Sequence, residues 1–376
     1  MTPANRRVRL VATLSAGLLV SAAALAACSS GSTSTEAASP AAATTAATAA
    51  APSSAAPAEL TKITYIMPWV IQGEEAGEFA ALNNGYFADE GLDVTIVPGG
   101  PDVRAGALLE SGSADFAVLN PAGVFTNRAE GIMTVGVGGL NQSDGLLLMC
   151  KKSTGIDSFE KLKGKKVGVW LGGGEAGFQA AAVKAGLQVA DVQWLPQKFS
   201  MDEFFNDAFD CASATEWNEK HVVYSNADFK DGANLFELRP TDLGMYLPGD
   251  SIVALQKTID ERPEIVQGVV NATMRGWQWV CSSPDNRKAG AQMTVDAAPD
   301  LDLALQVIQV DEMCNLMAQG PAKEEGMIGA LPQASWQAAA DAALAAGQLK
   351  VAADVATSYN TTFLDNVPAD YRKITW

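Results

Sequence analysis

The sequence predicts an α/β protein made of two similar units in series, each a mixed or mostly parallel sheet flanked by helices. Short apolar runs alternate with segments of helical periodicity, and the second series repeats the order of the first. The chain after Thr258 has the pattern expected of helices. With 376 residues, 48% hydrophobic and 18% charged, the protein is long enough for two domains with separate cores.

The first unit begins with an apolar run after Lys62. Its alternation of strands and helices favours parallel neighbours joined by crossover helices. We expect strands at 63–67, 92–97, 115–119, 132–137 and 146–150, and helices at 74–84, 103–111 and 121–130.

The second unit repeats this order, with strands at 166–170, 192–195, 211–215, 234–238 and 251–255 and helices at 175–185, 201–209 and after Glu216. Prolines separate four later helices at 263–281, 285–297, 301–318 and 332–345. Since these helices must bury their apolar faces, we expect them on the first unit. The chain then crosses between lobes near 148–152 and 249–253. The predicted lobes are residues 61–149 with 254–376, and residues 150–253.

The N-terminus has the pattern of an export signal. Three arginines precede an uncharged apolar run, and small residues lead up to Cys28. This pattern resembles the bacterial lipobox, which implies a signal peptide over 1–27, lipidation of Cys28 and a membrane-anchored protein on the extracytoplasmic face. An ordinary secretory signal with an incidental cysteine is the alternative. Residues 28–60 are rich in Ala, Ser, Thr and Pro, as expected of a flexible linker.

Charge and motifs exclude several classes of function. The net charge of −17 at pH 7 is unfavourable for binding nucleic acid. The chain contains no H-E-x-x-H and no paired C-x-x-C, so we expect no metal site and no cofactor.

Four cysteines follow Cys28, and in an oxidising compartment they allow three disulfide connectivities. We expect the pairs Cys150–Cys211 and Cys281–Cys314, because each pair lies within one predicted lobe. Buried free thiols remain the alternative.

Three phrases in chain order resemble a known family: GYFADEGLDV at 85–94, LESGSADFAV at 109–118 and LKGKKVGV at 162–169. They are similar to motifs of solute-binding proteins of bacterial ABC importers, in the branch that takes up sulfonates, nitrate, riboflavin and the thiamine pyrimidine precursor. The resemblance implies a two-lobed periplasmic-binding-protein-like fold (type II) with two hinge crossovers. It also implies a small-molecule solute and ABC permease subunits as partners. We expect a monomer.

Ligand-binding residues are expected directly after strands, because ligands of open α/β sheets lie beyond the carboxyl ends of strands. Three tryptophans occur there, and their rigid rings suit an aromatic solute, although packing in a core is the alternative role for each. Glycines before a helix can expose N–H groups to a ligand, or form a simple turn. The candidates are Trp69, Gln72, Glu74, Asn120, Asp144, Trp170, Gly173, Gly174, Glu175, Glu216, Trp217 and Asn218.

These candidate loops lack basic residues. Lys, Arg and His are absent from 63–103, 129–150, 167–183 and 199–219. A sulfonate or nitrate is normally met by guanidinium, ammonium or several N–H donors. We therefore expect a neutral, amino-bearing heteroaromatic solute such as the thiamine pyrimidine precursor or a flavin, with a small anion as the alternative.

Two other classes of function remain open. The resembling branch includes pyridoxal-phosphate-using synthases of the thiamine pyrimidine that sacrifice a histidine. The single histidine here, His221, fits a solvated helix face, so we expect no enzyme. The other rival is an adhesion or signalling lipoprotein that binds a protein partner.

Overall fold

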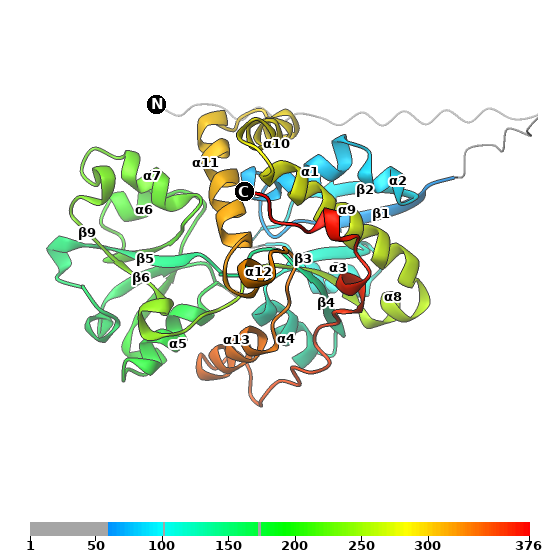
Figure 1. Cartoon of the computed structure of the whole chain (residues 1–376). Helices are drawn as coiled ribbons and strands as arrows, with labels where there is room; N and C mark the ends of the chain where they lie inside the picture. Colours follow the sequence, from blue (N-terminus) through cyan, green and yellow to red (C-terminus); the bar gives the residue numbers. More distant parts are fainter. Residues whose placement is uncertain (1–58, 101, 172–173) are drawn as a thin grey trace, which may run out of the picture. The chain divides into compact units, whose positions relative to one another are not determined.

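The computed structural model describes residues 59–100, 102–171 and 174–376 (Figure 1). The predicted signal peptide, the lipidation of Cys28 and the linker up to residue 58 lie outside the described residues. None of the described helices is both long enough and apolar enough to cross a membrane.

The first sheet has five strands in the order β2-β1-β3-β10-β4. Strand β1 pairs in parallel with β2 and β3, whereas β10 pairs antiparallel with β3 and β4. The strands are β1 Thr61–Ile66, β2 Leu92–Val97, β3 Phe116–Leu119, β4 Thr134–Gly139 and β10 Ser251–Leu255. Its helices are α1 Ala76–Asn83, α2 Tyr86–Asp89, α3 Ala105–Glu110 and α4 Pro121–Ala129, and the short 3₁₀ helix η1 is Gly73–Glu75.

The second sheet also has five strands, in the order β7-β6-β8-β5-β9. Its strands are β5 Leu146–Lys151, β6 Lys166–Val169, β7 Gln193–Pro196, β8 Cys211–Thr215 and β9 Leu235–Leu238. The associated helices are α5 Ala176–Lys184, α6 Asp202–Phe205 and α7 Glu219–Ser225. Strand β6 runs parallel to β7 and β8, and β5 runs antiparallel to β8 and β9, so both sheets are mixed.

Strand β5 illustrates why the second sheet is buried on both faces. Leu148 and Cys150 belong to one apolar cluster and Leu147 and Met149 to another, because successive side chains of a strand point to opposite faces. We expected this run to end the first unit, but it pairs only within the second sheet. An uninterrupted apolar run identifies a buried strand without identifying its sheet.

The C-terminal helices pack on the first sheet, as expected, and the cluster that contains its strands also contains Val266, Trp277 and Trp336. Helices α1 and α9 approach so closely that a Cβ on Gly276 would lie 2.1 Å from the Gly77 carbonyl oxygen. These helices are α8 Gln256–Glu261, α9 Pro263–Cys281, α10 Pro284–Ala297, α11 Leu303–Met317, α12 Gly320–Glu325, α13 Gln333–Ala345 and α14 Thr362–Asp365. Further 3₁₀ turns are Lys152–Thr154, Phe159–Leu162, Val189–Asp191, Lys230–Gly232, Pro240–Leu243 and Ala369–Tyr371.

Two disulfides join the same pairs that we expected from the sequence. Cys150–Cys211 links the neighbouring strands β5 and β8, and Cys281–Cys314 links helices α9 and α11. A cross-link of this kind stabilises a fold by about 2–4 kcal/mol, mainly by restricting the unfolded chain.

Candidate ligand-binding site

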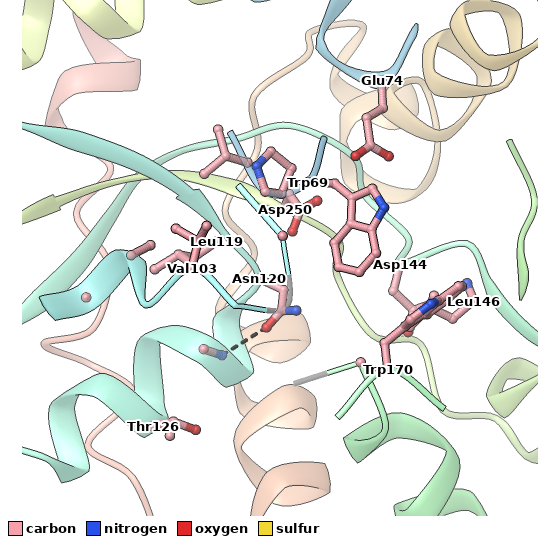
Figure 2. A pocket seen from close by; sticks show the side chains of 18 of the residues that line it. Trp69, Glu74, Val103, Leu119, Asn120, Thr126, Asp144, Leu146, Trp170 and Asp250 are labelled. Atoms are coloured by element: carbon pink, nitrogen blue, oxygen red, sulfur yellow. Dashed lines mark hydrogen bonds between the residues drawn. The ribbon is translucent and has the colours of Figure 1, made fainter. Parts of the chain in front are cut away.

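A cavity of about 490 Å³ is lined by residues from the loops at the edges of both sheets (Figure 2). This volume lies within the range of small-molecule sites.

The first sheet contributes residues beyond the carboxyl ends of β1 and β3. Strand β1 leads into Pro68 and Trp69, and β3 leads into Asn120, all of which line the cavity. Asn120 is also the N-cap of α4, where its Oδ1 accepts a hydrogen bond from the Gly123 N–H at 2.9 Å (Figure 2). Pro121 at the first helical position fixes the start of that helix.

Asp250 lines the cavity from the amino end of β10. Because β10 is antiparallel to β3, Ser251 pairs with Leu119, and Asp250 therefore lies at the same edge of the sheet as Asn120. The preceding Gly249 packs closely on Asn141, whose Oδ1 accepts a hydrogen bond from the Asp250 N–H at 2.8 Å.

The second sheet contributes Trp170 after β6, Thr215 at the end of β8, and Trp217 two residues later. Asp144 precedes β5, whose Leu146 pairs with Thr215. The Leu146 N–H donates to Asp144 Oδ1 at 3.2 Å, which orients this carboxyl group at the edge of the sheet.

Two indole rings of the cavity touch one another across the two sheets. The ring centroids of Trp69 and Trp170 are 6.1 Å apart with an interplanar angle of 65°, and Phe199 contacts Trp69 at 5.1 Å. The indole N–H of Trp170 is shielded from solvent and has no hydrogen-bond partner among the described residues. It is therefore a donor that a ligand can satisfy.

Trp217 has a more buried environment. Its side chain is 7% exposed and belongs to the cluster that forms the core of the first sheet. Its indole Nε1 donates to Glu74 Oε2 at 2.5 Å, which connects the loop after β8 with η1. This burial agrees with the core-packing role that the sequence left open for each tryptophan, although Trp217 also lines the cavity.

Helix α11 holds η1 in position. The N–H of Gly73 donates to the side-chain oxygens of Gln306 at 2.7 Å and Gln309 at 2.9 Å. Gln309 Nε2 also contacts Gln72 Oε1 at 3.3 Å and Asn218 Oδ1 at 3.1 Å. These amides therefore orient the turn that presents Gln72 and Glu74 to the cavity.

Four of the acidic groups that line the cavity have raised pKa values. Burial, aided by the nearby negative charge of Asp250, raises the pKa of Glu74 to about 7. Burial likewise raises the pKa of Asp144 to about 7 and that of Asp250 to about 6. Burial also raises the pKa of Glu219, although Thr215 donates hydrogen bonds to its carboxylate.

Basic groups contribute almost nothing to this lining. Among the described residues that line the cavity, the one cationic side chain is Arg104, which is 76% exposed and pairs with Glu130 at 3.1 Å. In the part of the chain that the structure describes, no group of three or more His, Cys, Asp or Glu side chains is arranged to hold a metal ion.

Most of the residues expected at the site do line the cavity: Trp69, Gln72, Glu74, Asn120, Asp144, Trp170, Gly174 and Trp217. Three others do not. Glu216 instead forms ion pairs with Lys220 and Arg239, both at 2.6 Å. Glu175 is buried and accepts a hydrogen bond from Gln348, and Asn218 bonds to Gln309 and Glu219. Gly173 lies outside the described residues.

Sequence reasoning missed Asp250, Thr126 and Asn127, which also line the cavity. We searched only the segments that follow strands, whereas Asp250 precedes one. The amino end of an antiparallel strand lies at the same sheet edge as the carboxyl ends of its neighbours. Thr126 and Asn127 lie on α4, so a search of the first turns after each strand excludes them.

Curated relatives match different lengths of this chain. It is 25% identical over 321 residues to the riboflavin-binding protein RibY of Chloroflexus aurantiacus, covering 82% of this chain and 89% of that protein. It is 23% identical over 230 residues to the formylaminopyrimidine-binding protein of Halalkalibacterium halodurans, covering 60% and 68%. A putative thiamine biosynthesis protein of Haemophilus influenzae is 27% identical over 141 residues, covering 37% of this chain and only 45% of that protein.

Solved structures share the fold. The periplasmic aliphatic sulphonate binding protein SsuA of Escherichia coli aligns with a TM-score of 0.62 at 16% identity, covering 80% of this chain and 91% of that one. The periplasmic nitrate-binding protein NrtA of Synechocystis PCC 6803 aligns with a TM-score of 0.62 at 14% identity, covering 83% and 91%. A Candida albicans protein with the generic periplasmic binding protein fold has a TM-score of 0.56 at 14% identity, covering 81% and 96%.

The fold expected from the sequence, an α/β protein of periplasmic-binding-protein type, is thus confirmed. The family model described as NMT1/THI5 like matches residues 72–287, which is more than half of the chain and includes most of the cavity. The protein belongs to the NMT1/THI5-like family.

Proposed function

We propose that this protein is the extracytoplasmic solute-binding component of an ABC importer and that it captures a small amino-bearing heteroaromatic molecule. The observation that supports the proposal most directly is the lining of the 490 Å³ cavity, where indole rings and carboxyl groups meet without an unpaired basic side chain among the described residues.

The indoles supply flat apolar surface for a ring, and the carboxyl and amide groups supply hydrogen-bond partners for ring nitrogens and amino groups. Trp69 and Trp170 are only partly buried, so a ring has access to them. Asn120 retains its amide N–H groups for a ligand, because only its Oδ1 caps the helix. Two relatives are named as binding proteins for formylaminopyrimidine and for riboflavin, which agrees with this class of solute.

A sulfonate or nitrate is the alternative solute, and the names of two structural neighbours mention such anions. The acids Glu74, Asp144 and Asp250 oppose an anion in this cavity, since like charges repel strongly where water is scarce. Arg104 is already paired with Glu130 at the exposed margin.

We further propose that the two sheets are the cores of two lobes that close on the solute, with the hinge in the segments before β5 and before β10. Ligands that bind a closed form more tightly shift the population toward it. The export signal and Cys28 place the lobes outside the membrane in this proposal, where a permease can receive the solute.

Isothermal titration calorimetry tests the solute class. We expect binding of the hydroxymethyl-aminopyrimidine precursor of thiamine or of riboflavin, and no binding of taurine or nitrate. Tight binding of taurine or nitrate without binding of the ring compounds would contradict the proposal. A thermal-shift screen of vitamins and precursors extends the test, because a ligand at a hundredfold excess over its Kd adds about 2.7 kcal/mol to stability.

The purified protein also allows a test of whether the chain is an enzyme. If the protein were a pyridoxal-phosphate-dependent synthase, the purified chain would show the absorbance of bound cofactor and would consume its own histidine. We expect neither, and the solute should be recovered chemically unchanged after release.

A further inference from the structure

The cavity has an excess of acidic groups that come from separate parts of the fold. Glu74 comes from η1, Asp144 from the segment before β5, Asp250 from the segment before β10 and Glu219 from α7. Figure 2 shows the labelled carboxyl groups of Glu74, Asp144 and Asp250 around the cavity together with Trp69 and Trp170. Carboxyl groups that converge in this way are costly to bury unless they are protonated or paired with a cation.

The elements behind Glu74 add two more buried acids. Behind Glu74 lie Glu75 of η1 and Glu78 of α1, each 1% exposed, and both carboxylate oxygens of Glu78 lack a hydrogen-bond partner among the described residues. Lys220 of α7 and Arg239 after β9 both form ion pairs with Glu216, which does not line the cavity. Among the described residues, Glu74, Asp144, Glu219 and Asp250 of the cavity form no ion pair with a basic side chain, whereas Glu130 at its margin pairs with Arg104.

The aromatic side chains are also suited to positive charge. The face of an indole ring attracts a cation by about 0.5–1 kcal/mol at exposed sites and by about 2 kcal/mol or more when water is excluded. Trp69 and Trp170 belong to segments of different sheets and lie edge to face against one another, so a ligand in the cavity can contact both rings. A net charge of −17 adds long-range attraction for cations.

We propose that the solute is an organic cation whose positive charge lies on a planar ring or directly beside one. This inference rests on the proposed solute-binding function and specifies the charge of the solute. The carboxylates of Glu74, Asp144 and Asp250 supply the counter-charge, and the indoles supply the ring surface. A neutral heteroaromatic uses the rings but leaves the acidic groups without the partner that offsets their burial.

A cationic solute should bind with an affinity that changes with pH in a definite direction. In the free protein, burial raises the pKa of Asp250 to about 6 and the pKa values of Glu74 and Asp144 to about 7. A bound cation favours the ionised carboxylates, so it lowers these pKa values and releases protons. Cation affinity therefore rises as the pH increases through this range, whereas a neutral solute that accepts a hydrogen bond from a protonated carboxyl group loses affinity.

Matched pairs of neutral and cationic rings provide the test. We would titrate nicotinamide against its ring-N-methylated cation, and the aminopyrimidine alcohol against thiamine, which adds a thiazolium cation to the same pyrimidine. Calorimetry is carried out about one pH unit below and above the range of the raised pKa values. We expect at least one cation to bind tenfold or more tightly than its neutral partner at the higher pH, with that preference reduced at the lower pH.

Two charge-neutralising variants, Glu74→Gln and Asp250→Asn, should each reduce the preference for the cation over its neutral partner at least fivefold. The matched control is Asp93→Asn, which removes a charge from the exposed face of β2 and should leave the preference unchanged.

The outcomes separate the inference from the proposed function. If a neutral ring binds as tightly as its cation at both pH values, the inference is overturned and solute capture stands. If the Asp93 variant loses the preference as much as the cavity variants do, the effect is one of net charge and the inference is likewise overturned. If none of the rings binds, the proposed capture of heteroaromatic solutes fails as well.

Discussion

Trp170 and Trp217 both follow a strand of the second sheet, but they serve the site differently. Trp170 is partly exposed and contacts the ring of Trp69, while its buried indole N–H has no hydrogen-bond partner among the described residues. Trp217 is 7% exposed, packs in the core of the first sheet and donates to Glu74. One is positioned to bind, and the other supports both the fold and the orientation of Glu74.

Replacing each tryptophan separates these roles. We expect Trp170→Ala to weaken solute binding at least tenfold, about 1.4 kcal/mol, because a ring surface is lost, with little change in the stability of the free protein. Trp217→Ala should lower the free energy of unfolding by about 3–5 kcal/mol, the usual cost of deleting a buried tryptophan. Urea denaturation and calorimetry on both variants check this, and equal loss of stability in the two would contradict it.

The buried acids predict that the free protein is more stable in mild acid than at neutral pH. Burial raises the pKa of Glu78 to about 7. At pH values between the ordinary pKa of a glutamate and about 7, the folded state therefore binds more protons than the unfolded state. The stability that results is present at low pH and decreases as the pH rises toward about 7. Urea denaturation across pH measures it, and Glu78→Gln should reduce the slope. A slope that is unchanged in the variant would argue against this origin.

Much of the site could be predicted from residue type and position after a strand, as Trp69, Asn120 and Trp170 show. Two kinds of information were lacking. Nothing local in the sequence marks Asp250 as a neighbour of Asn120, because their proximity depends on the antiparallel pairing of β10 with β3. Glu216 follows β8 just as Trp217 does, yet its carboxylate forms an ion pair with Arg239, which is distant in sequence.

At the scale of elements, the short η1 depends on α11. The Gly73 N–H binds two glutamine side chains of α11, and the disulfide between Cys281 and Cys314 ties α11 to α9. Helix α11 is distant in sequence from η1, so the sequence alone indicated a helix without indicating what it supports. Its buried glutamines are the residues that connect it to the site.

Gly73 itself tests this support. A Cβ at this position would lie 2.7 Å from the Gln306 carbonyl oxygen and 2.8 Å from Gln309 Cβ, so α11 and η1 would have to separate. We expect Gly73→Ala to lower stability by about 1–3 kcal/mol and to weaken solute binding at least tenfold by displacing Glu74. Gln306→Ala, which leaves Gln309 as acceptor, should have the smaller effect on binding. Calorimetry that finds wild-type affinity in Gly73→Ala would show that Glu74 does not depend on this contact.

At the scale of the whole molecule, the described contacts between segments of the two sheets are partly aromatic, as between Trp69 and Trp170, and partly hydrogen bonds. They include Trp217 with Glu74, Asn218 with Gln309, and Glu175 with Gln348. Each hydrogen bond contributes only about 0.5–1.5 kcal/mol, so a small set of them is compatible with reversible opening. The helix α13 packs on both α4 and α5 and is the larger connection between the two halves.

This arrangement predicts a measurable closure. Small-angle scattering should show a smaller radius of gyration with saturating solute than without it, because the solute adds contacts to both lobes. Trp217→Phe, which keeps most of the ring volume and removes the indole donor to Glu74, should raise the radius of gyration of the free protein. Identical scattering curves with and without solute would exclude a hinged clamp.

The placement of β10 has a consequence for how the polypeptide is made. This strand lies between β3 and β4 of the first sheet, yet the whole of the second sheet precedes it along the chain. During synthesis, more than a hundred residues follow β4 before β10, the strand that separates β3 from β4, leaves the ribosome. Such long-range pairing delays folding. An export machinery that translocates unfolded chains would therefore receive this protein before its first sheet has formed.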